Sequence, residues 1–218
     1  MGISWSMKIL FKTISAKVTK TDLLVLLSPE GRAPKLPPGV SIPKSVLTSF
    51  LGKSRETRFA DTIDGPTERV LLIGLGKGKS FDLETVRRAA AIAAQKAEKT
   101  DAASVSFWVD LKLGKSAVEF GQALGEGLVM GAHRLVDFKR SPKQSSLKKV
   151  VIQSSKEVSS GVKTGAIVGE GNTFARRLQD TPANKMRPKD MVAEARKIAK
   201  SSPRITVKAL DEKLMEKL

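Results

Sequence analysis

Apolar residues recur along the chain with two periods that alternate from segment to segment. Continuous apolar runs of strand length, such as residues 22–27 and 69–75, are typical of strands buried on both faces of a sheet. Between them, apolar residues spaced three and four apart predict amphipathic helices. The pattern predicts strands over residues 7–14, 22–27, 58–62, 69–75, 104–109, 148–154 and 205–210, and helices over residues 46–52, 81–99, 116–136, 161–180, 188–200 and 212–218.

Strands and helices alternate in this order, which predicts an α/β domain with a sheet between layers of helices. The helix over residues 116–136 carries four glycines, at positions 121, 125, 127 and 131. Each glycine inside a helix costs about 1 kcal/mol relative to alanine. Four of them therefore predict a helix whose backbone lies close to its neighbours.

A sharp break separates the last two long helices. Pro182 donates no backbone hydrogen bond and disfavours helical angles at Thr181, so the first helix should end near Asp180. Asn184 suits a turn, and Pro188 suits the first position of a new helix. The second helix then places Met191, Val192, Ala195, Ile198 and Ala199 on one apolar stripe.

Three stretches around these elements resemble the leucyl aminopeptidase family. Residues 175–184 (ARRLQDTPAN), followed by Pro188 and by residues 193–195, resemble the segment that joins the family's two domains. Residues 69–77 (RVLLIGLGK) resemble its strand-and-glycine signature, and residues 126–134 (EGLVMGAHR) its Glu-Gly-x-x-x-Gly-x-x-Arg helix. The resemblance covers about residues 67–218. Asp180, Arg187 and His133 depart from it, at positions where Asn, a helix-capping Thr and an aromatic residue are usual.

The resemblance implies an architecture. Residues 1–160 would form a macro-like N-terminal domain, with three α/β/α layers and a mixed sheet. Residues 161–182 would form a long connecting helix. Residues 183–218 would be the truncated start of a second, catalytic α/β domain, whose exposed apolar residues would leave this tail mobile or cause self-association.

The resemblance also implies a function. Leucyl aminopeptidases release N-terminal amino acids from peptides with two divalent metals, Zn or Mn, and assemble as hexamers. Their metal ligands and catalytic residues lie downstream of the segment matched here. No catalytic, metal-binding or cofactor-binding residue is therefore assigned in this chain, which alone is expected to be inactive. We expect it to contribute to assembly and regulation, with the peptide substrate bound through the missing domain.

The net charge of +17, from 39 basic and 22 acidic residues, leaves a second hypothesis open. A basic α/β module could bind nucleic acid, such as DNA, or an ADP-ribose-like ligand. Aromatic residues interleaved with basic ones, which stack bases, are lacking. The densest basic cluster, and hence the candidate polyanion patch, is Lys139, Arg140, Lys143, Lys148 and Lys149.

Residues 74–80 (GLGKGKS) raise the question of a phosphate-binding loop. A Walker loop needs a first glycine at position 73, where Ile73 stands, and a dinucleotide-binding Gly-x-Gly-x-x-Gly needs a third glycine at Lys79. The stretch is therefore better interpreted as a tight turn. Zero cysteines and the lack of any 18-residue apolar run or signal peptide favour a cytoplasmic protein without membrane attachment.

Overall fold

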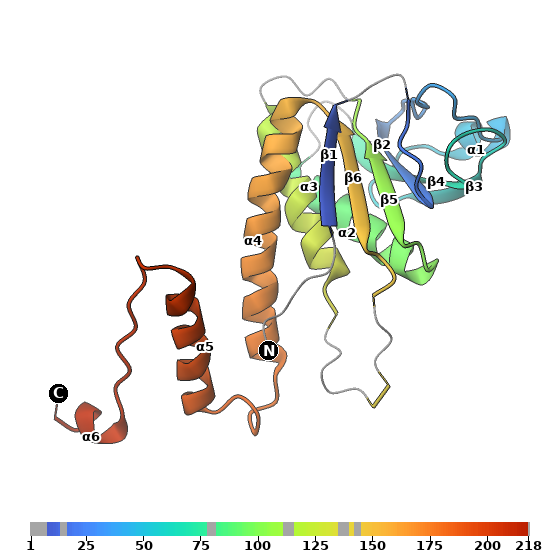
Figure 1. Ribbon diagram of the computed structural model, residues 1–218. Coiled ribbons are helices and arrows are strands. Elements are labelled where there is room, and N and C mark those ends of the chain that lie inside the picture. The colour runs from blue at the N-terminus through green and yellow to red at the C-terminus, as the bar shows by residue number, and fades with distance from the viewer. Residues whose placement is uncertain are drawn as a thin grey trace. The chain divides into compact units, whose positions relative to one another are not determined.

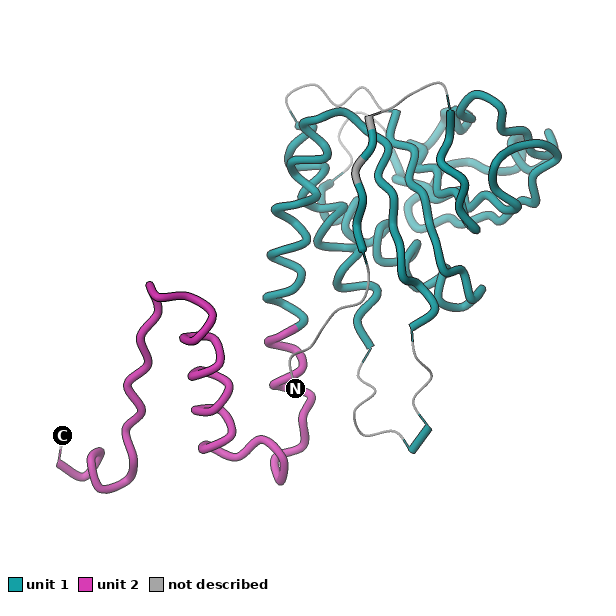
Figure 2. The backbone as a smooth tube through the Cα atoms, viewed as in Figure 1, with its two compact units in different colours: residues 1–173 teal, residues 174–218 magenta. Residues whose placement is uncertain are grey.

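The computed structural model describes residues 8–13, 17–77, 82–110, 116–134, 140–141 and 145–217. The chain divides into two compact units, unit 1 over residues 1–173 and unit 2 over residues 174–218 (Figure 2). Each is described by itself below.

Unit 1 is built on one six-stranded sheet with the strand order β1-β6-β5-β2-β4-β3 (Figure 1). All neighbouring strands run parallel except β3, which pairs antiparallel with β4 at one edge. The sheet is therefore mixed, as predicted. Its strands are β1 (Lys8–Thr13), β2 (Leu23–Glu30), β3 (Thr57–Asp61), β4 (Arg69–Lys77), β5 (Ser104–Trp108) and β6 (Lys149–Ser154).

The two most apolar strands lie side by side in the middle of the sheet. Leu24 of β2 pairs with Val70 of β4, and both side chains are fully buried. A strand covered on both faces has no solvent-facing positions, so its sequence shows no alternation. This explains why the runs at residues 22–27 and 69–75 are continuously hydrophobic.

Helices cover the two faces of the sheet unequally. One face packs against α2 (Leu83–Lys99), α3 (Ala117–Ala132) and the first part of α4 (Lys156–Asp180), around Phe107 and Phe120. The other face packs against the segment around Phe50, which includes the six-residue helix α1 (Lys44–Ser49). The predicted three layers are present, and the second helical layer is the thinner one.

Glycines let α3 lie between α2 and α4 at very short range. A Cβ on Gly127 would stand 2.0 Å from the carbonyl oxygen of Arg87 in α2. On the opposite side, a Cβ on Gly121 would stand 2.1 Å from the carbonyl oxygen of Val158 in α4. Real side chains do not approach a backbone so closely, so the prediction of close backbone contact is confirmed.

The long helix α4 begins earlier than predicted, directly after β6. The hydroxyl of Ser155 accepts a hydrogen bond from the backbone N–H of Val158, which satisfies one of the free amides of the first turn. Val158 and Val162 then enter the core of unit 1. The predicted domain boundaries at residues 160 and 182 stay predictions; unit 1 extends along α4 to Thr173.

Unit 2 contains the end of α4, the break, α5 (Pro188–Ser201) and the short helix α6 (Glu212–Met215). Helix α4 ends at Asp180, and the backbone N–H groups of Lys185 and Met186 donate to the carbonyl oxygen of Pro182. Where a helix-capping Thr was expected, the carboxylate of Asp190 accepts a hydrogen bond from the backbone N–H of Arg187. Both the turn and the start of α5 at Pro188 are thus confirmed.

The predicted strand over residues 205–210 is wrong. These residues have no regular secondary structure, and Ile205, Val207 and Leu210 are exposed. A strand needs a neighbour to accept its backbone hydrogen bonds. Within the described residues the sheet ladders involve only β1 to β6. The predicted helix that follows is confirmed as α6, and the carboxylate of Asp211 caps it by accepting from the N–H of Leu214.

Candidate functional site

The described residues do not assemble a metal centre. Among residues 8–13, 17–77, 82–110, 116–134, 140–141 and 145–217, no group of three His, Cys, Asp or Glu side chains is placed to hold a metal ion. Several acidic side chains instead pair with arginines or with backbone amides. The two least exposed of these are Glu126 and Glu98. Glu126 is the first residue of the EGLVMGAHR stretch, and Glu98 pairs with Arg134, its last residue.

Glu126 joins α3 to α2. Its carboxylate accepts a hydrogen bond from Arg87 Nε at 2.6 Å and another from Gln122 Nε2 at 2.9 Å. The Glu126 side chain is 8% exposed and that of Arg87 is 30% exposed. A buried carboxylate needs such partners. The pair sits next to Gly127, where the two helix backbones come closest, so the stretch positions helices.

Glu98 ties α2 to residues 145–147. Its carboxylate accepts from the backbone N–H of Ser146 and of Leu147, both at 3.1 Å, and from the hydroxyl of Ser145. Nη1 of Arg134, the last residue of the EGLVMGAHR stretch, lies 3.4 Å from Oε2 of Glu98. Burial alone would raise the pKa of Glu98, but the hydrogen bonds, that from Ser145 first, outweigh it and lower the pKa below its ordinary value.

The two glycines in the last part of β4 allow close packing. A Cβ on Gly74 would stand 2.0 Å from the carbonyl oxygen of Lys53, and Gly76 has a φ of +76°. The backbone N–H of Gly74 donates to Glu56 O, and that of Gly76 donates to Gly52 O. Amides bonded to the chain itself are not free to cradle a phosphate. The predicted tight turn is wrong for residues 74–77, because the strand continues through both glycines to Lys77. Residues 78–80 lie outside the described residues.

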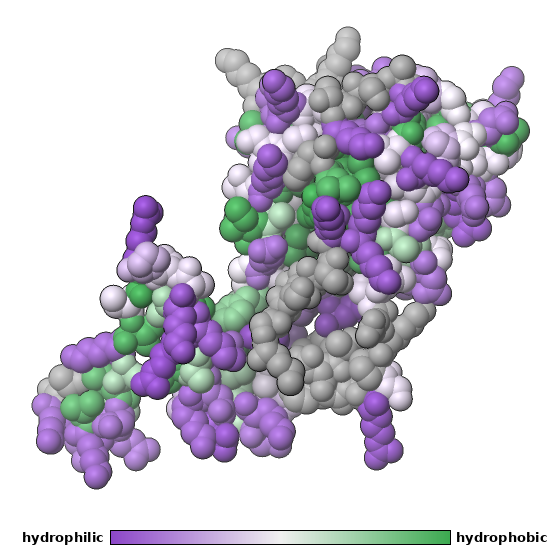
Figure 3. All heavy atoms as spheres, in the orientation of Figure 1, coloured by the Kyte–Doolittle hydropathy of each residue, from purple (hydrophilic) through white to green (hydrophobic). Residues whose placement is uncertain are grey.

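The predicted polyanion patch is only partly covered by the structure. Lys139 and Lys143 lie outside the described residues. Arg140 and Lys148 are exposed, and Lys149 is half-buried at the start of β6. The strongly hydrophilic side chains on the visible face of unit 1 are spread out (Figure 3). Polyanion binding by these five residues stays a prediction.

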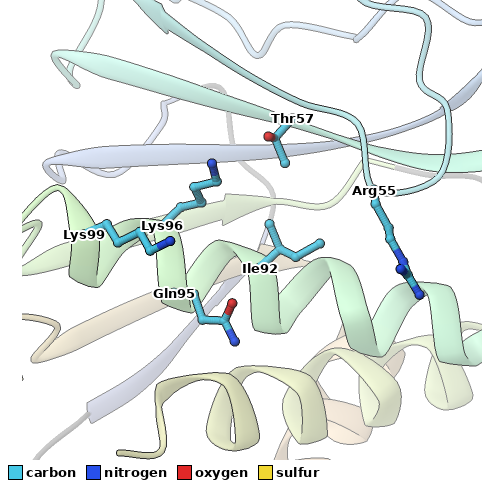
Figure 4. A pocket seen from close by; sticks show the side chains of 6 residues that line it. All are labelled: Arg55, Thr57, Ile92, Gln95, Lys96 and Lys99. Atoms are coloured by element: carbon cyan, nitrogen blue, oxygen red, sulfur yellow. The ribbon is translucent and has the colours of Figure 1, made fainter.

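Sequence reasoning missed a basic hollow beside the edge strand β3. It has a volume of about 270 Å³, and Figure 4 shows α2 on one side with β3 and the turn before it on the other. Its lining residues are Arg55, Thr57, Ile92, Gln95, Lys96 and Lys99. The spacing of Ile92, Lys96 and Lys99 places them on one face of a helix. No pattern in the sequence indicates that Arg55 faces them.

In unit 2, an ion pair connects the end of α4 to α5. Arg177 donates to the carboxylate of Glu194 at 3.0 Å, and Lys197 donates to the same carboxylate at 2.6 Å. The bond from Lys197, followed by the charge of Arg177, lowers the pKa of Glu194 despite partial burial. The guanidinium of Arg177 also lies 5.4 Å from the ring of Phe174. These contacts position α5 and form no reactive arrangement.

No helix in the described part of the chain is long and apolar enough to cross a membrane. Localisation in the cytoplasm stays a prediction.

Comparison with known proteins agrees with the resemblance found in the sequence. Residues 45–142 match the sequence profile of the cytosol aminopeptidase family, N-terminal domain. A probable cytosol aminopeptidase of Microcystis aeruginosa is 34% identical over 153 residues, covering 68% of this chain and 30% of the relative. A probable cytosol aminopeptidase of Aquifex aeolicus is 28% identical over 174 residues, covering 79% of this chain and 34% of the relative. The chain thus spans about a third of the length of these curated relatives.

Solved structures share the fold. A mutant of tomato leucine aminopeptidase superposes with a TM-score of 0.78 over 97% of this chain and 46% of that chain, at 21% sequence identity. The bottromycin maturation enzyme BotP, solved in complex with Mn, gives a TM-score of 0.68 over 83% of this chain and 36% of that chain, at 25% identity. The profile match, the curated relatives and the shared fold together show that this chain carries the N-terminal domain of the cytosol aminopeptidase family.

Proposed function

We propose that this chain is the N-terminal part of a metal-dependent aminopeptidase that releases N-terminal amino acids from peptides. Its own contribution is to assembly and regulation, and the chemistry belongs to a catalytic domain that it does not include. The names of the curated relatives and the share of their length that is matched support this proposal.

The observation that carries the proposal is the lack of a core in unit 2. Neither α5 nor α6 has a buried residue. Seven large apolar side chains of these helices and the segment between them are 37% to 53% exposed: Met191, Ile198, Ile205, Val207, Leu210, Leu214 and Met215. A segment with so much exposed apolar surface is expected to pack against something else. In the proposed parent enzyme, the rest of the catalytic domain covers it.

The parent enzyme would hold two divalent metals, Zn or Mn. Hard divalent ions in a hydrolytic centre need several carboxylate ligands. The ions would activate a bound water and hold the substrate carbonyl. The described residues offer no such group, and one structural neighbour, BotP, was solved in complex with Mn. The metals would therefore be bound by the missing domain.

Activity assays test both halves of the proposal. The 218-residue chain, incubated with an aminoacyl chromogenic substrate and Mn²⁺ or Zn²⁺, is expected to give no turnover above the blank. The full-length product of the parent gene is expected to hydrolyse the same substrate and to lose that activity on chelation. Turnover by the short chain would contradict the assignment of catalysis to the missing domain. Inactivity of the metal-loaded full-length product would contradict the aminopeptidase assignment.

The parent is further proposed to be a homo-oligomer, a hexamer as the resemblance implies. Sedimentation velocity of the full-length product tests this directly. A full-length product that stays monomeric at all concentrations would contradict this proposal. It would also contradict the proposed contribution of this chain to assembly.

A further inference from the structure

The hollow between α2 and β3 is strongly positive. Three of its six lining residues are cations, namely Arg55, Lys96 and Lys99, and none of these three forms an ion pair with any described residue. Arg55 and Lys99 are exposed, and Lys96 is half-buried. Three unpaired cations around a concave site repel one another, and a bound anion removes that repulsion.

The nearest carboxylates in sequence are used elsewhere. Glu56 follows Arg55, but its carboxylate accepts hydrogen bonds from the backbone N–H groups of Leu51 and Lys53. Glu98 precedes Lys99, but its carboxylate faces residues 145–147. Neither acid neutralises the hollow, so its charge is available to a ligand.

The other lining groups suit a polar ligand on a partly apolar floor. The Thr57 hydroxyl and the Gln95 amide form no hydrogen bond with another described residue, and both can donate one. In Figure 4, Ile92 lies between Lys96 and Arg55. Lys96 Nζ lies 5.9 Å from the centre of the Phe59 ring, which holds the ammonium near the hollow without cancelling its charge.

Arg55 is held in a conformation that an arginine rarely adopts. Its φ is +64°, in the left-handed region that favours glycine. The turn around it is fixed, because the N–H of Glu56 donates to Lys53 O at 2.9 Å. Glycine would adopt this positive φ with less strain than arginine. The geometry of the turn therefore does not explain why an arginine occupies position 55. A ligand for the guanidinium does explain it.

We propose that this hollow binds a small phosphate-bearing anion of about the size of pyrophosphate. Arg55 would contact phosphate oxygens through its planar fork, and Lys96 and Lys99 would act as point charges on the other side. The volume of about 270 Å³ suits a small molecule or a single phosphorylated group. All six lining residues belong to unit 1.

Calorimetric titration of the 218-residue chain with pyrophosphate, at about 0.15 M salt where distant charges are screened, tests the proposal. The chain is expected to bind saturably with one site. Arg55→Gly and Lys99→Gln should each lower the affinity about tenfold or more, because each removes a charged hydrogen-bond donor.

The matched control is Arg58→Gln. Arg58 lies on the same strand as Thr57, but its side chain projects to the opposite face, since neighbouring residues of a strand alternate. Arg58→Gln removes one positive charge, as Lys99→Gln does. The affinity for pyrophosphate should stay within about twofold of wild type, because screened charges outside the site contribute little. Arg55→Gly should melt at or above the wild-type temperature, since glycine relaxes the positive φ. If this variant melts normally but binds pyrophosphate more weakly, the loss of affinity comes from the loss of the site and not from unfolding.

Two results of the pyrophosphate titrations, and a third from a competition experiment, would overturn the proposal. One is the absence of saturable binding by the wild-type chain. The other is an equal loss of affinity in Arg58→Gln and Arg55→Gly, which would mean that pyrophosphate responds to the net charge alone. A competition arm distinguishes the source of the phosphate. If duplex DNA displaces pyrophosphate and its binding also depends on Arg55, the hollow recognises a nucleic-acid backbone, and the small-molecule assignment is wrong.

Discussion

Both units of this chain contain amphipathic helices, but the units differ in what holds those helices in place. In unit 1, Val86 and Ala90 of the amphipathic helix α2 are fully buried in the core. In unit 2, Met191 and Ile198 of the amphipathic helix α5 are 46% and 41% exposed. An apolar stripe predicts a helix in both places. Only unit 1 supplies the surface against which such a stripe is buried.

The difference shows which interactions stabilise each unit. Unit 1 gains free energy from burying apolar side chains on both faces of a sheet. Unit 2 depends on local contacts: the cap at Asp190, the cap at Asp211, and the pair of Arg177 with Glu194. Such contacts contribute about 1 kcal/mol each or less. A helix as short as α5 is marginal when it has no packing partner.

The largest expected contrast is between core truncations in the two units. Phe107→Ala should lower the free energy of unfolding by about 3–5 kcal/mol, because it leaves a cavity in the core of unit 1. Ile198→Ala should change it by less than about 0.5 kcal/mol, since its side chain is exposed. Urea denaturation monitored by circular dichroism measures both. A large loss in Ile198→Ala would show that unit 2 has a partner within this chain.

A second pair of variants tests helix packing along α4 itself. A Cβ on Gly165 would stand 2.0 Å from the carbonyl oxygen of Gln122, whereas a Cβ on Gly171 would meet nothing within 4 Å. Gly165→Ala should destabilise the chain by about 1–3 kcal/mol through overpacking. Gly171→Ala should stabilise it by up to about 1 kcal/mol through helix propensity. Thermal unfolding of both variants measures this contrast, and equal shifts would contradict the packing of α3 on α4.

A smaller effect concerns the pH dependence of unit 1. The pKa of Glu98 is lowered in the folded state, because the hydrogen bonds to its carboxylate outweigh the effect of burial. Its contribution to stability is therefore present above its ordinary pKa of 4.5, and it is lost as the pH falls through the lowered value. Glu98→Gln should cost about 1 kcal/mol at pH 7 and should flatten the loss of stability below pH 4.5. Denaturant titrations at several pH values test this; an unchanged slope would contradict it.

The smallest effect is expected in unit 2. Glu194→Gln removes the acceptor shared by Arg177 and Lys197. The Glu194 side chain is 13% exposed. Ion pairs close to the surface contribute about 0.2–1 kcal/mol and weaken with salt. The variant should speed hydrogen exchange in α5 and leave β4 unchanged. Faster exchange in β4 as well would mean that the two units unfold together.

Most elements of the fold were predictable because their sequence patterns are local. The buried runs of β2 and β4, the glycines of α3 and the prolines at residues 182 and 188 each carry their own physical reason. The strand predicted at residues 205–210 failed because a strand requires a neighbour, which an apolar pattern cannot supply. The early start of α4 was missed because residues 156–160 are mostly polar and show no helical apolar stripe.

The basic hollow was not predictable for a related reason. Arg55 and Lys96 are far apart in sequence, and only the pairing of β3 with β4 beside α2 brings them together. Clusters of basic residues can be found in the sequence, as at residues 139–149. Cations that meet through tertiary structure leave no such pattern.

Hydrogen exchange of the 218-residue chain, at a concentration where sedimentation shows a monomer, tests the contrast between the units most directly. The account predicts that amides of residues 70–73 in β4 exchange at rates set by global unfolding, while those of residues 193–217 exchange orders of magnitude faster. Equal protection of the two segments in the monomer would contradict it, because unit 2 would then have a stabilising core of its own.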